Sequence, residues 1–370
     1  MIVLLLLLLL GAVIWLSAGL LRRFGFSNLT YSLAFSEDEV TEGDTVYLTE
    51  TICSAKLLPL PWVKAELTTS AALEFASKQS SVADETRFVS SFFTLRPYKK
   101  IERRWKVICK RRGEFTVSHA VLILSDLFGS GELSQPFPEA KAAIRVLPAV
   151  REISLPDTLP EQMNGDLIRQ RSLMPDRLAF CGIRPYADGD PLRDICWSAT
   201  ARMGSPMIRQ FHETISPGVT VLFNVQTRET DREQTSDRRL CEAGIRLCAA
   251  VLHDAAVRRI PVRFCANTAI GDNPVETLPD TGADGSLRML RLLAALPVTI
   301  SGRFPALMRQ VCQHDSASAF IVITALPDAE LLEIAAAEPR ITVLSLRRLP
   351  NGSVYRNVLF VPPETERSIS

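Results

Sequence analysis

The chain has 370 residues with a formal net charge of +1, and 47% of its residues are hydrophobic. This length accommodates two domains and an anchoring segment, and the hydrophobic content favours folded cores over disorder. Because 42 basic residues balance 41 acidic ones, there is no overall positive field, which argues against nucleic acid as a partner. The eight cysteines show no Cys-x-x-Cys spacing, which indicates reduced, mostly buried thiols in a cytosolic compartment.

The N-terminus is an apolar run from Ile2 to Leu21 that is followed at once by Arg22 and Arg23. About 20 helical residues at about 1.5 Å each cover the roughly 30 Å hydrocarbon core of a bilayer. We therefore expect residues 1–23 to form a single-pass transmembrane anchor in the inner (cytoplasmic) membrane, with lipid as its partner. Positive charge after the run places the rest of the chain in the cytoplasm. A cleaved signal peptide is the alternative, but no Ala-x-Ala cleavage site occurs.

Residues 28–148 consist of short alternating runs separated by turn signals such as Glu42-Gly-Asp44 and Arg112-Gly113. About seven short strands of this kind are typical of an immunoglobulin-like β-sandwich. The strands that we expect are Thr30–Phe35, Thr45–Cys53, Val63–Thr68, Arg87–Leu95, Arg103–Lys110, Glu114–Ser118 and Val121–Ser125.

The segment from Arg96 to Arg112 carries nine Lys and Arg residues. We interpret it as a charged strand that protects a sheet edge, because Lys and Arg commonly do so. Contact with anionic lipid beside the anchor is the alternative. Tyr98 and Trp105 in this segment suit either an interface or a core.

The densest polar motif lies between Arg184 and Gly204, in a connector of residues 149–218. Asp190 before Pro191 is a typical helix N-cap, and Gly204 is a typical left-handed residue at a helix end. Apolar residues between them repeat at i, i+3, i+4 and i+7, so the pattern predicts a helix that opens at Pro191.

This segment resembles the hallmark of the bacterial domain-of-unknown-function family 58, roughly Arg-x-Tyr-x-x-Gly-Asp-x-x-Arg-x-Ile-x-Trp-x-x-x-Ala-Arg. The family's Asp before the Trp is Cys196 here. The resemblance extends to Arg112–Gly129, which is similar to the family's Arg-Gly-x-Tyr pair of strands. It implies a membrane segment, a β-rich middle and a C-terminal domain similar to a von Willebrand factor A domain. The hallmark residues are Arg184, Tyr186, Gly189, Asp190, Arg193, Asp194, Trp197 and Arg202.

We interpret the hallmark as a structural clamp, in which Asp190 caps the helix, Arg184 and Arg193 pair with carboxylates, and Trp197 is buried. A partner-binding surface is the alternative, because Arg, Trp and Tyr are also the residues of interaction hot spots.

Residues 219–362 alternate between apolar runs and amphipathic helices, which predicts an open parallel sheet covered on both faces. The expected strands are Val219–Val225, Pro261–Ala266, Ala319–Thr324, Ile341–Leu346 and, at an edge, Val354–Val361. The expected helices are Asp237–Arg258, Ser286–Ala295, Arg303–His314 and Ala329–Ala337. The fold class is therefore α+β multidomain: a transmembrane helix, an immunoglobulin-like β-sandwich, and an α/β open sheet similar to a von Willebrand A domain, with a tail of residues 363–370.

In the domain that the resemblance implies, a Mg²⁺ site of the form Asp-x-Ser-x-Ser lies at the carboxyl ends of the strands. The matching positions here are Asn224, Gln226 and Arg228, and Thr324 stands where relatives often show Ser. Because the anionic ligands are missing and Arg228 adds a cation, we expect a degenerate site that binds no metal and no cofactor. It is either a metal-free binding face or a site without function.

No zinc-binding His pattern, nucleophile elbow or Walker motif occurs, so we expect a protein that is not an enzyme. The resemblance implies a MoxR-type AAA+ ATPase as partner, often alongside other membrane proteins. We therefore expect a membrane-anchored scaffold in an assembly or chaperone-like system. Two alternatives remain open: a metal-dependent ligand-binding A domain, and a hydrolase or transferase with a site around Asp188, Asp190, Asp194 and Arg202.

Overall fold

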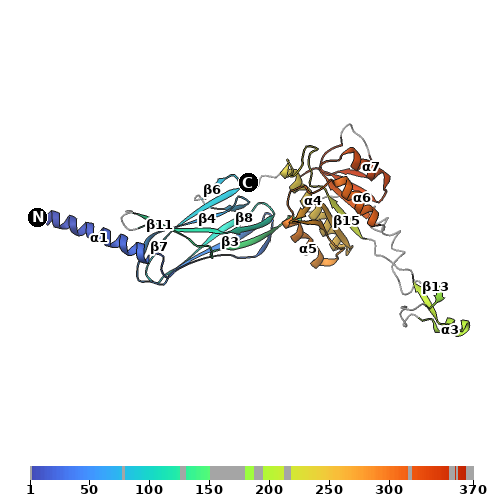
Figure 1. The fold of residues 1–370 in the computed structure, drawn as a ribbon, viewed down its shortest axis with the longest axis horizontal. Coiled ribbons are helices and arrows are strands. Elements are labelled where there is room, and N and C mark those ends of the chain that lie inside the picture. The colour runs from blue at the N-terminus through green and yellow to red at the C-terminus, as the bar shows by residue number, and fades with distance from the viewer. Residues whose placement is uncertain are drawn as a thin grey trace. The chain divides into compact units, whose positions relative to one another are not determined.

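The structure is a computed structural model, and it describes residues 2–76, 80–125, 131–150, 180–186, 195–211, 218–315, 319–349, 355 and 357–363. The side chains of residues 2–7, 10, 180–182, 184 and 209–211 lie outside that description. The chain forms two compact units, one of Met1–Ala149 with Leu290–Ala295 and one of the remaining residues (Figure 1). Both units contain β-strands and α-helical residues, so the protein belongs to the mixed α and β class.

The first unit begins with helix α1 (Ile2–Phe24), whose last turn holds Arg22 and Arg23. Leu21 is buried in the core of the following strands. Lys56 donates hydrogen bonds from Nζ to the carbonyl oxygens of Phe24 (2.8 Å) and Gly25. A cation at these carbonyls satisfies groups that the helix end leaves unpaired and offsets the helix dipole. Among the described residues, no helix is both long and apolar enough to cross a membrane.

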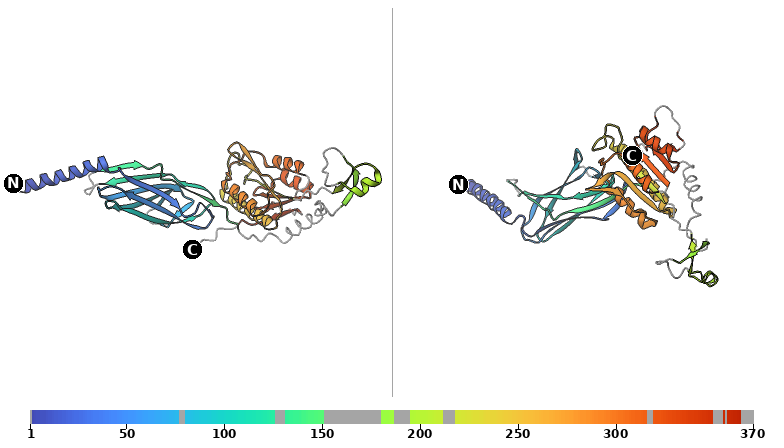
Figure 2. Two further views of the ribbon diagram at one scale, coloured as in Figure 1. Left: turned by 90° about the horizontal axis from the view of Figure 1, so that it is seen from below. Right: turned by 45° about the vertical axis from the view of Figure 1, so that its right-hand side comes forward.

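Twelve strands follow α1 in the described part of the first unit, and most of them form a β-sandwich (Figure 2). One sheet has the order β1-β3-β8-β5, a second β11-β10-β4-β7-β6, and a third β2-β12-β9. Side chains that alternate inward from these sheets build one hydrophobic core. The strands are β1 (Leu29–Phe35), β2 (Glu39–Thr41), β3 (Thr45–Ser54), β4 (Leu60–Ser70), β5 (Leu73–Phe75), β6 (Ser80–Ala83), β7 (Thr86–Leu95), β8 (Lys100–Cys109), β9 (Gly113–Val117), β10 (His119–Ser125), β11 (Glu132–Pro136) and β12 (Ala142–Leu147).

All seven strands expected from the alternation are present, which confirms the β-sandwich. The expected edge position holds for the first part of β8 and fails at its end, because β3 pairs with Lys100–Ile108 on one side and, among the described residues, β5 pairs only with Val107–Cys109 on the other. The structure also places the two aromatic residues of this segment. Trp105 of β8 packs in the core, whereas Tyr98, which precedes the strand, is 66% exposed.

The buried carboxylate of Glu50 links strands of both large sheets. Its Oε1 accepts hydrogen bonds from the hydroxyls of Tyr31 (2.6 Å) and Ser91 (2.6 Å), and its Oε2 accepts one from Nε1 of Trp105 (2.9 Å). Tyr31, Glu50 and Trp105 lie on β1, β3 and β8, whereas Ser91 lies on β7 of the facing sheet. Burial and the neighbouring carboxylate raise the pKa of Tyr31, so its hydroxyl keeps the proton that it donates.

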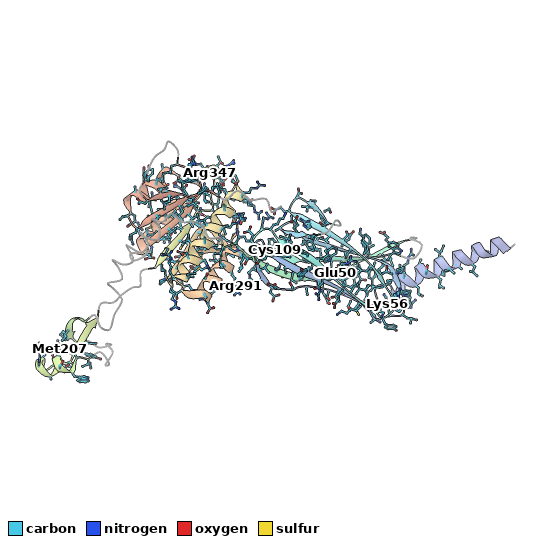
Figure 3. The ribbon with its side chains drawn as sticks, turned by 180° about the vertical axis from the view of Figure 1, so that it is seen from behind. Glu50, Lys56, Cys109, Met207, Arg291 and Arg347 are labelled. Carbon is cyan, nitrogen blue, oxygen red and sulfur yellow. The ribbon has the colours of Figure 1, made fainter. Side chains whose placement is uncertain are left out.

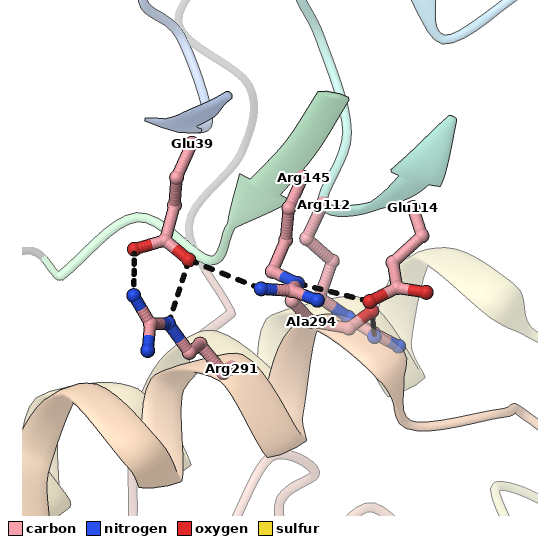
Figure 4. Close-up of polar contacts among 6 residues, drawn as sticks. All are labelled: Glu39, Arg112, Glu114, Arg145, Arg291 and Ala294. Carbon is pink, nitrogen blue, oxygen red and sulfur yellow. Dashed lines mark hydrogen bonds and ion pairs between the residues drawn. The ribbon is translucent and has the colours of Figure 1, made fainter. Parts of the chain in front are cut away.

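The first unit also includes Leu290–Ala295, and an ion pair joins this segment to a group of charged side chains on the strands (Figure 4). Glu39 on β2 accepts hydrogen bonds from Nε (2.8 Å) and Nη2 (3.2 Å) of Arg291. Arg145 on β12 pairs with Glu39 (3.4 Å) and with Glu114 (2.9 Å). The hydrogen bonds from Arg291 hold the pKa of Glu39 below its ordinary value.

The second unit begins, in its described part, with strand β13 (Phe180–Pro185), helix α3 (Trp197–Met203) and strand β14 (Met207–Phe211). The two strands pair antiparallel to form a small sheet of their own. This element contains the described part of the hallmark.

A six-stranded sheet forms the main body of the second unit, in the order β17-β16-β15-β18-β19-β20. Its neighbouring strands are parallel except for β17, which is antiparallel to β16 and makes the sheet mixed where we expected it to be parallel. The strands are β15 (Val219–Phe223), β16 (Val262–Ile270), β17 (Asn273–Glu276), β18 (Ala319–Thr324), β19 (Ile341–Ser345) and β20 (Val358–Phe360). The helices are α4 (Arg238–Val257), α5 (Gly282–Ala295), α6 (Phe304–His314) and α7 (Ala329–Ala337), and the last six residues of α5 are the Leu290–Ala295 segment of the first unit.

Helices cover both faces of this sheet. Leu222 of β15 belongs to the core that α6 and α7 build on one face. Its neighbour Phe223 points to the opposite face, where a Cβ on Gly244 of α4 would lie 2.6 Å from its ring. Gly244 therefore lets α4 approach the sheet closely. Because helices cover both faces, a ligand can reach the sheet at the carboxyl ends of its parallel strands.

Candidate functional site

The carboxyl ends of β15, β16 and β18 are joined by a network of neutral side chains. Asn224, directly after β15, donates from Nδ2 to Oγ1 of Thr324 at the end of β18 (3.2 Å). Its Oδ1 accepts from Nδ2 of Asn267 in β16 (3.0 Å) and from the backbone N–H of Gln226 (3.1 Å). Asn267 in turn accepts from the backbone N–H of Val225 (2.8 Å). The three side chains that cross between strands are 4% exposed or less, so this network is a buried cross-link of the sheet edge.

The loop after β15 is organised around the carboxylate of Asp231. Its Oδ2 accepts from the backbone N–H (3.0 Å) and the hydroxyl (2.9 Å) of Thr227 and from the backbone N–H of Arg228 (3.0 Å), and its Oδ1 accepts from the hydroxyl of Ser236. Burial alone raises the pKa of Asp231, but these hydrogen bonds outweigh it and lower the pKa to about 2. The carboxylate is therefore charged at neutral pH and acts as the centre of the loop.

A pocket of about 430 Å³ lies beside this edge of the sheet. Ile300 and Leu326, both half-buried, contribute apolar surface to it, next to the buried start of α6 at Phe304 and Pro305. The network also holds the wall of the pocket through Asn267. Its Nδ2 donates to the carbonyl oxygen of Gly302 (3.4 Å), and its backbone carbonyl accepts from the backbone N–H of Ser301 (3.0 Å). Ser301 and Gly302 both line the pocket.

Charged groups of both signs line the same pocket. Arg303 pairs with Glu330 (2.7 Å), and Asp328 accepts from the backbone N–H of Leu331 (2.8 Å) as the N-cap of α7. Glu229 and Arg232 are exposed residues of the loop after β15. Apolar surface surrounded by charges of both signs is suited to a segment of a protein partner, whose side chains supply both kinds of group.

Three of the four degenerate metal-site positions expected from the sequence belong to this network or pocket, and the fourth does not. Asn224 and Thr324 lie in the network and Gln226 lines the pocket, whereas Arg228 is exposed and is not part of the lining. The arginines of the pocket are Arg232 and Arg303.

Sequence reasoning missed Asn267 and Asp231. Asn267 carries a readable signal, because it lies on a buried apolar strand as an amide that matches the one after β15. Asp231 carries none, since its role depends on how the loop returns to Thr227 and Ser236.

Within the described ranges, no group of three or more His, Cys, Asp or Glu side chains is arranged to hold a metal ion. None of the described cysteines forms a disulfide, and five of them are buried: Cys109, Cys196, Cys241, Cys248 and Cys265. Burial raises the pKa of the Cys109, Cys265 and Cys312 thiols to about 11, so these groups are protonated at neutral pH and are poor nucleophiles.

Helix α3 of the hallmark ends as expected and begins later than expected. Gly204 closes it with φ of 69°, in the left-handed region. The expected continuous helix is wrong at Ile195 and Cys196, which precede the start of α3 at Trp197, and Pro191 itself lies outside the described residues. The two residues before it are held by β14: Ile195 forms a bridge with Ile208, and the backbone N–H of Cys196 donates to the carbonyl of Met207 (2.8 Å).

The expected burial of Trp197 is also wrong, since its side chain is 72% exposed and α3 has no buried residue. Arg202 on the same helix is exposed, and the backbone N–H of Tyr186 donates to the carbonyl of Pro206 (2.9 Å). An exposed tryptophan contributes little to a clamp and is typical of a contact surface. The remaining hallmark positions Gly189, Asp190, Arg193 and Asp194, together with Asp188, lie outside the described residues, as does the side chain of Arg184.

The chain is therefore a mixed α and β protein of two units, in which a β-sandwich precedes a mostly parallel α/β sheet with a pocket at the carboxyl ends of its strands. The model of the family described as "Protein of unknown function DUF58" matches residues 182–335, which include the whole hallmark and most of the α/β sheet. This match supports the family resemblance read from the hallmark. The comparison with curated proteins gave no match.

Several solved structures resemble part of this chain. They include a non-cellulosomal cohesin from Archaeoglobus fulgidus (10% identity over 36% of this chain and 97% of that one, TM-score 0.23) and the CARDB domain of a Pyrococcus furiosus protein (10%, 33% and 96%, TM-score 0.22). A cohesin module of a family 33 glycoside hydrolase from Clostridium perfringens is similar at 9% identity over 33% of this chain and 97% of that one, with a TM-score of 0.24. Scores this low carry no argument about function.

Proposed function

We propose that the protein is a membrane-anchored interaction protein without enzymatic activity, whose α/β unit binds a protein partner at the carboxyl edge of its sheet. The observation that carries the proposal is the pocket beside the Asn224–Asn267–Thr324 network. The network holds the strand ends together with neutral hydrogen bonds, so the pocket keeps its shape without an ion. Its lining contains apolar surface and charged groups of both signs.

A von Willebrand A-like domain is the finer form of this proposal. It is supported by the central parallel strands, by the helices on both faces, and by the position of the pocket at the carboxyl edge. The anchor is supported by the apolar sequence from Ile2 to Leu21, and the placement of both units in the cytoplasm, beneath the inner membrane, by Arg22 and Arg23 after it. A MoxR-type AAA+ ATPase is the partner that the family resemblance favours, within an assembly or chaperone-like system.

The test is the binding of a purified MoxR-type ATPase of the same organism to the full chain in detergent, measured by calorimetry. Arg232→Glu reverses a charge in the pocket, and we expect it to weaken binding by about tenfold, equivalent to about 1.4 kcal/mol. Arg228→Glu is the matched control, because Arg228 is an exposed residue of the same loop outside the pocket lining. Binding should persist in a metal chelator.

Two outcomes would overturn the proposal. If both charge reversals leave the affinity unchanged while Trp197→Ala abolishes binding, the hallmark and not the pocket is the contact surface. If binding is lost in the metal chelator, the proposal that the pocket binds its partner without a metal ion is wrong.

A further inference from the structure

Large apolar side chains are exposed at the end of the first unit that adjoins α1. Leu57 is 75% exposed, Tyr98 66%, Trp62 59% and Phe24 45%. Singly exposed apolar residues are common on proteins, but four of this size at one end of a β-sandwich form a patch that calls for a partner.

Hydrogen bonds place the loop residues of this patch beside the helix end. Lys56 caps α1 through the carbonyls of Phe24 and Gly25, which brings its neighbour Leu57 to the helix (Figure 3). The backbone N–H of Tyr98 donates to the carbonyl of Lys56 (3.2 Å), so the loop before β8 lies there too.

Strand register places Trp62 at the same end. Trp62 on β4 is opposite Ser125 on β10, next to the pair of Val63 and Leu124. A Cβ on Gly25 would lie 3.1 Å from Cδ1 of Leu124, so this end of β10 contacts the residue that follows α1.

Basic residues are gathered around the patch. Those at this end are Arg22, Arg23, Arg96, Lys99 and Lys100, all exposed. The described carboxylates nearby are Glu102, which pairs with Lys100 (2.5 Å), and Glu132, which is opposite Ser125. Five cations against two carboxylates leave this end positive among the described residues.

We propose that this end of the β-sandwich, here named the collar (Phe24, Leu57, Trp62, Tyr98 and the five basic residues around them), inserts into the headgroup region of an anionic bilayer. The inference rests on the membrane anchoring proposed above. Tryptophan and tyrosine prefer the membrane interface, and Lys and Arg next to them are attracted to anionic headgroups.

Two observations favour lipid over a soluble partner as the occupant. The collar continues the apolar surface of α1, where Leu16 (61%), Leu20 (42%) and Phe24 (45%) are exposed at a spacing of four residues. The charge of the collar also complements that of an anionic leaflet. Because Leu21 is buried in the sandwich core and Lys56 caps the helix, α1 and the collar are one surface, and the helix axis sets how the collar meets the bilayer.

The experiment uses the full chain reconstituted in vesicles of phosphatidylcholine, with or without phosphatidylglycerol, that contain lipids brominated near the headgroup. The chain has four tryptophans, and Trp105 is buried and hydrogen-bonded to Glu50, so it serves as a common background. One reporter carries Trp15→Phe and Trp197→Phe and keeps Trp62. A second carries Trp62→Phe and Trp197→Phe and keeps Trp15 of α1. The background alone is measured in Trp15→Phe/Trp62→Phe/Trp197→Phe.

A matched control places a tryptophan away from the collar by adding Tyr47→Trp to the background variant. Tyr47 is 49% exposed on β3 and lies seven residues from Ser54, whose backbone N–H donates to the carbonyl of Lys99 at the collar. At about 3.3 Å per residue the control is about 23 Å further along the strand.

We expect the bromolipids to quench Trp62 severalfold more than the tryptophan at position 47, and more strongly in vesicles that contain phosphatidylglycerol. Quenching of Trp15 without quenching of Trp62 would overturn the collar and leave the anchor intact, and a protein partner would then become the occupant to seek. If Trp15 itself is not quenched, the anchoring in the proposed function is wrong. Equal quenching of Trp62 and the position 47 tryptophan would show contact without a specific collar and would also overturn the inference.

Discussion

Glu50 is a carboxylate with no exposed surface, and three neutral donors surround it. A buried charge is costly to desolvate, and hydrogen bonds to a charged group offset more of that cost than hydrogen bonds between neutral groups. The three donors come from both large sheets, so the carboxylate ties the sandwich together through its centre.

We predict that Glu50→Gln destabilises the first unit by about 2 kcal/mol. The amide has one acceptor oxygen, so when that oxygen keeps Tyr31 and Ser91, the NH₂ group faces the N–H of Trp105, and two donors meet. Urea unfolding followed by tryptophan fluorescence measures the change. Glu66→Gln is the control, because Glu66 pairs with Lys64 on the exposed side of β4. This substitution should change the free energy of unfolding by less than about 0.5 kcal/mol. Equal midpoints for wild type and Glu50→Gln would show that the charge of Glu50 does not hold the sheets.

We predict that Asp231 stabilises the second unit in a pH-dependent way. Its folded pKa of about 2 lies below the ordinary value of 3.8, so its stabilisation is complete above about pH 4 and is lost as the pH falls toward 2. A difference of this size corresponds to about 2 kcal/mol for a residue that is 4% exposed. Thermal melts should show Asp231→Asn less stable than wild type at pH 7, with the gap narrowing in acid. Glu229→Gln, an exposed carboxylate of the same loop, should show no such gap.

At the scale of elements, the two candidate contact surfaces differ in how they are held. The pocket lies where β15, β16 and β18 end, and a buried network joins all three. The hallmark element is a two-stranded sheet with one short helix, in which Cys196, Met207 and Ile208 are the described buried side chains. The pocket is therefore the better pre-organised of the two surfaces. The hallmark element instead presents a tryptophan, Trp197, that is largely exposed.

We predict that Asn224→Asp destabilises the sheet edge by about 1 kcal/mol and does not create a tight metal site. Oγ1 of Thr324 already donates to the carbonyl of Leu326 (3.0 Å), so the new carboxylate oxygen meets an acceptor where the amide donated. Calorimetric titration of wild type and Asn224→Asp with Mg²⁺ and Mn²⁺ should show no saturable binding at sub-millimolar metal. Saturable binding by the wild type that disappears in Asn224→Ala would contradict the metal-free site.

At the scale of the whole molecule, the two units have different tasks in the proposed function. The first places a collar and a capped helix at one end of a β-sandwich, and the second carries the pocket and the hallmark. Lipid contact and partner binding thus belong to separate units, and the Trp62 and Arg232 tests can fail independently.

Local patterns predicted most of the elements. The strand Ala319–Thr324 and the helix Ala329–Ala337 have the expected bounds, because a continuous apolar run and the cap at Asp328 are both signals within a few residues. The start of α3 was misjudged for the opposite reason, since the pairing of Ile195 with Ile208 outweighs the helical periodicity around it. The charges of β8 are typical of an edge strand, and the first part of β8 is one among the described residues, whereas the tertiary structure adds Leu73–Phe75 as a second neighbour at Val107–Cys109.

The amino-acid sequence by itself determined the class of each unit, the position of most of its strands and helices, and the neutral character of Asn224 and Thr324. Only the tertiary structure decided that Asn267 completes their network, that Glu50 joins two sheets, that Trp197 is exposed and that Trp62 lies at the end of the sandwich that adjoins α1. Periodicity and caps act between residues a few positions apart, so they can be read along the chain. Burial and hydrogen-bond partners depend on residues that are distant in sequence, and these meet only when the sheets and helices assemble.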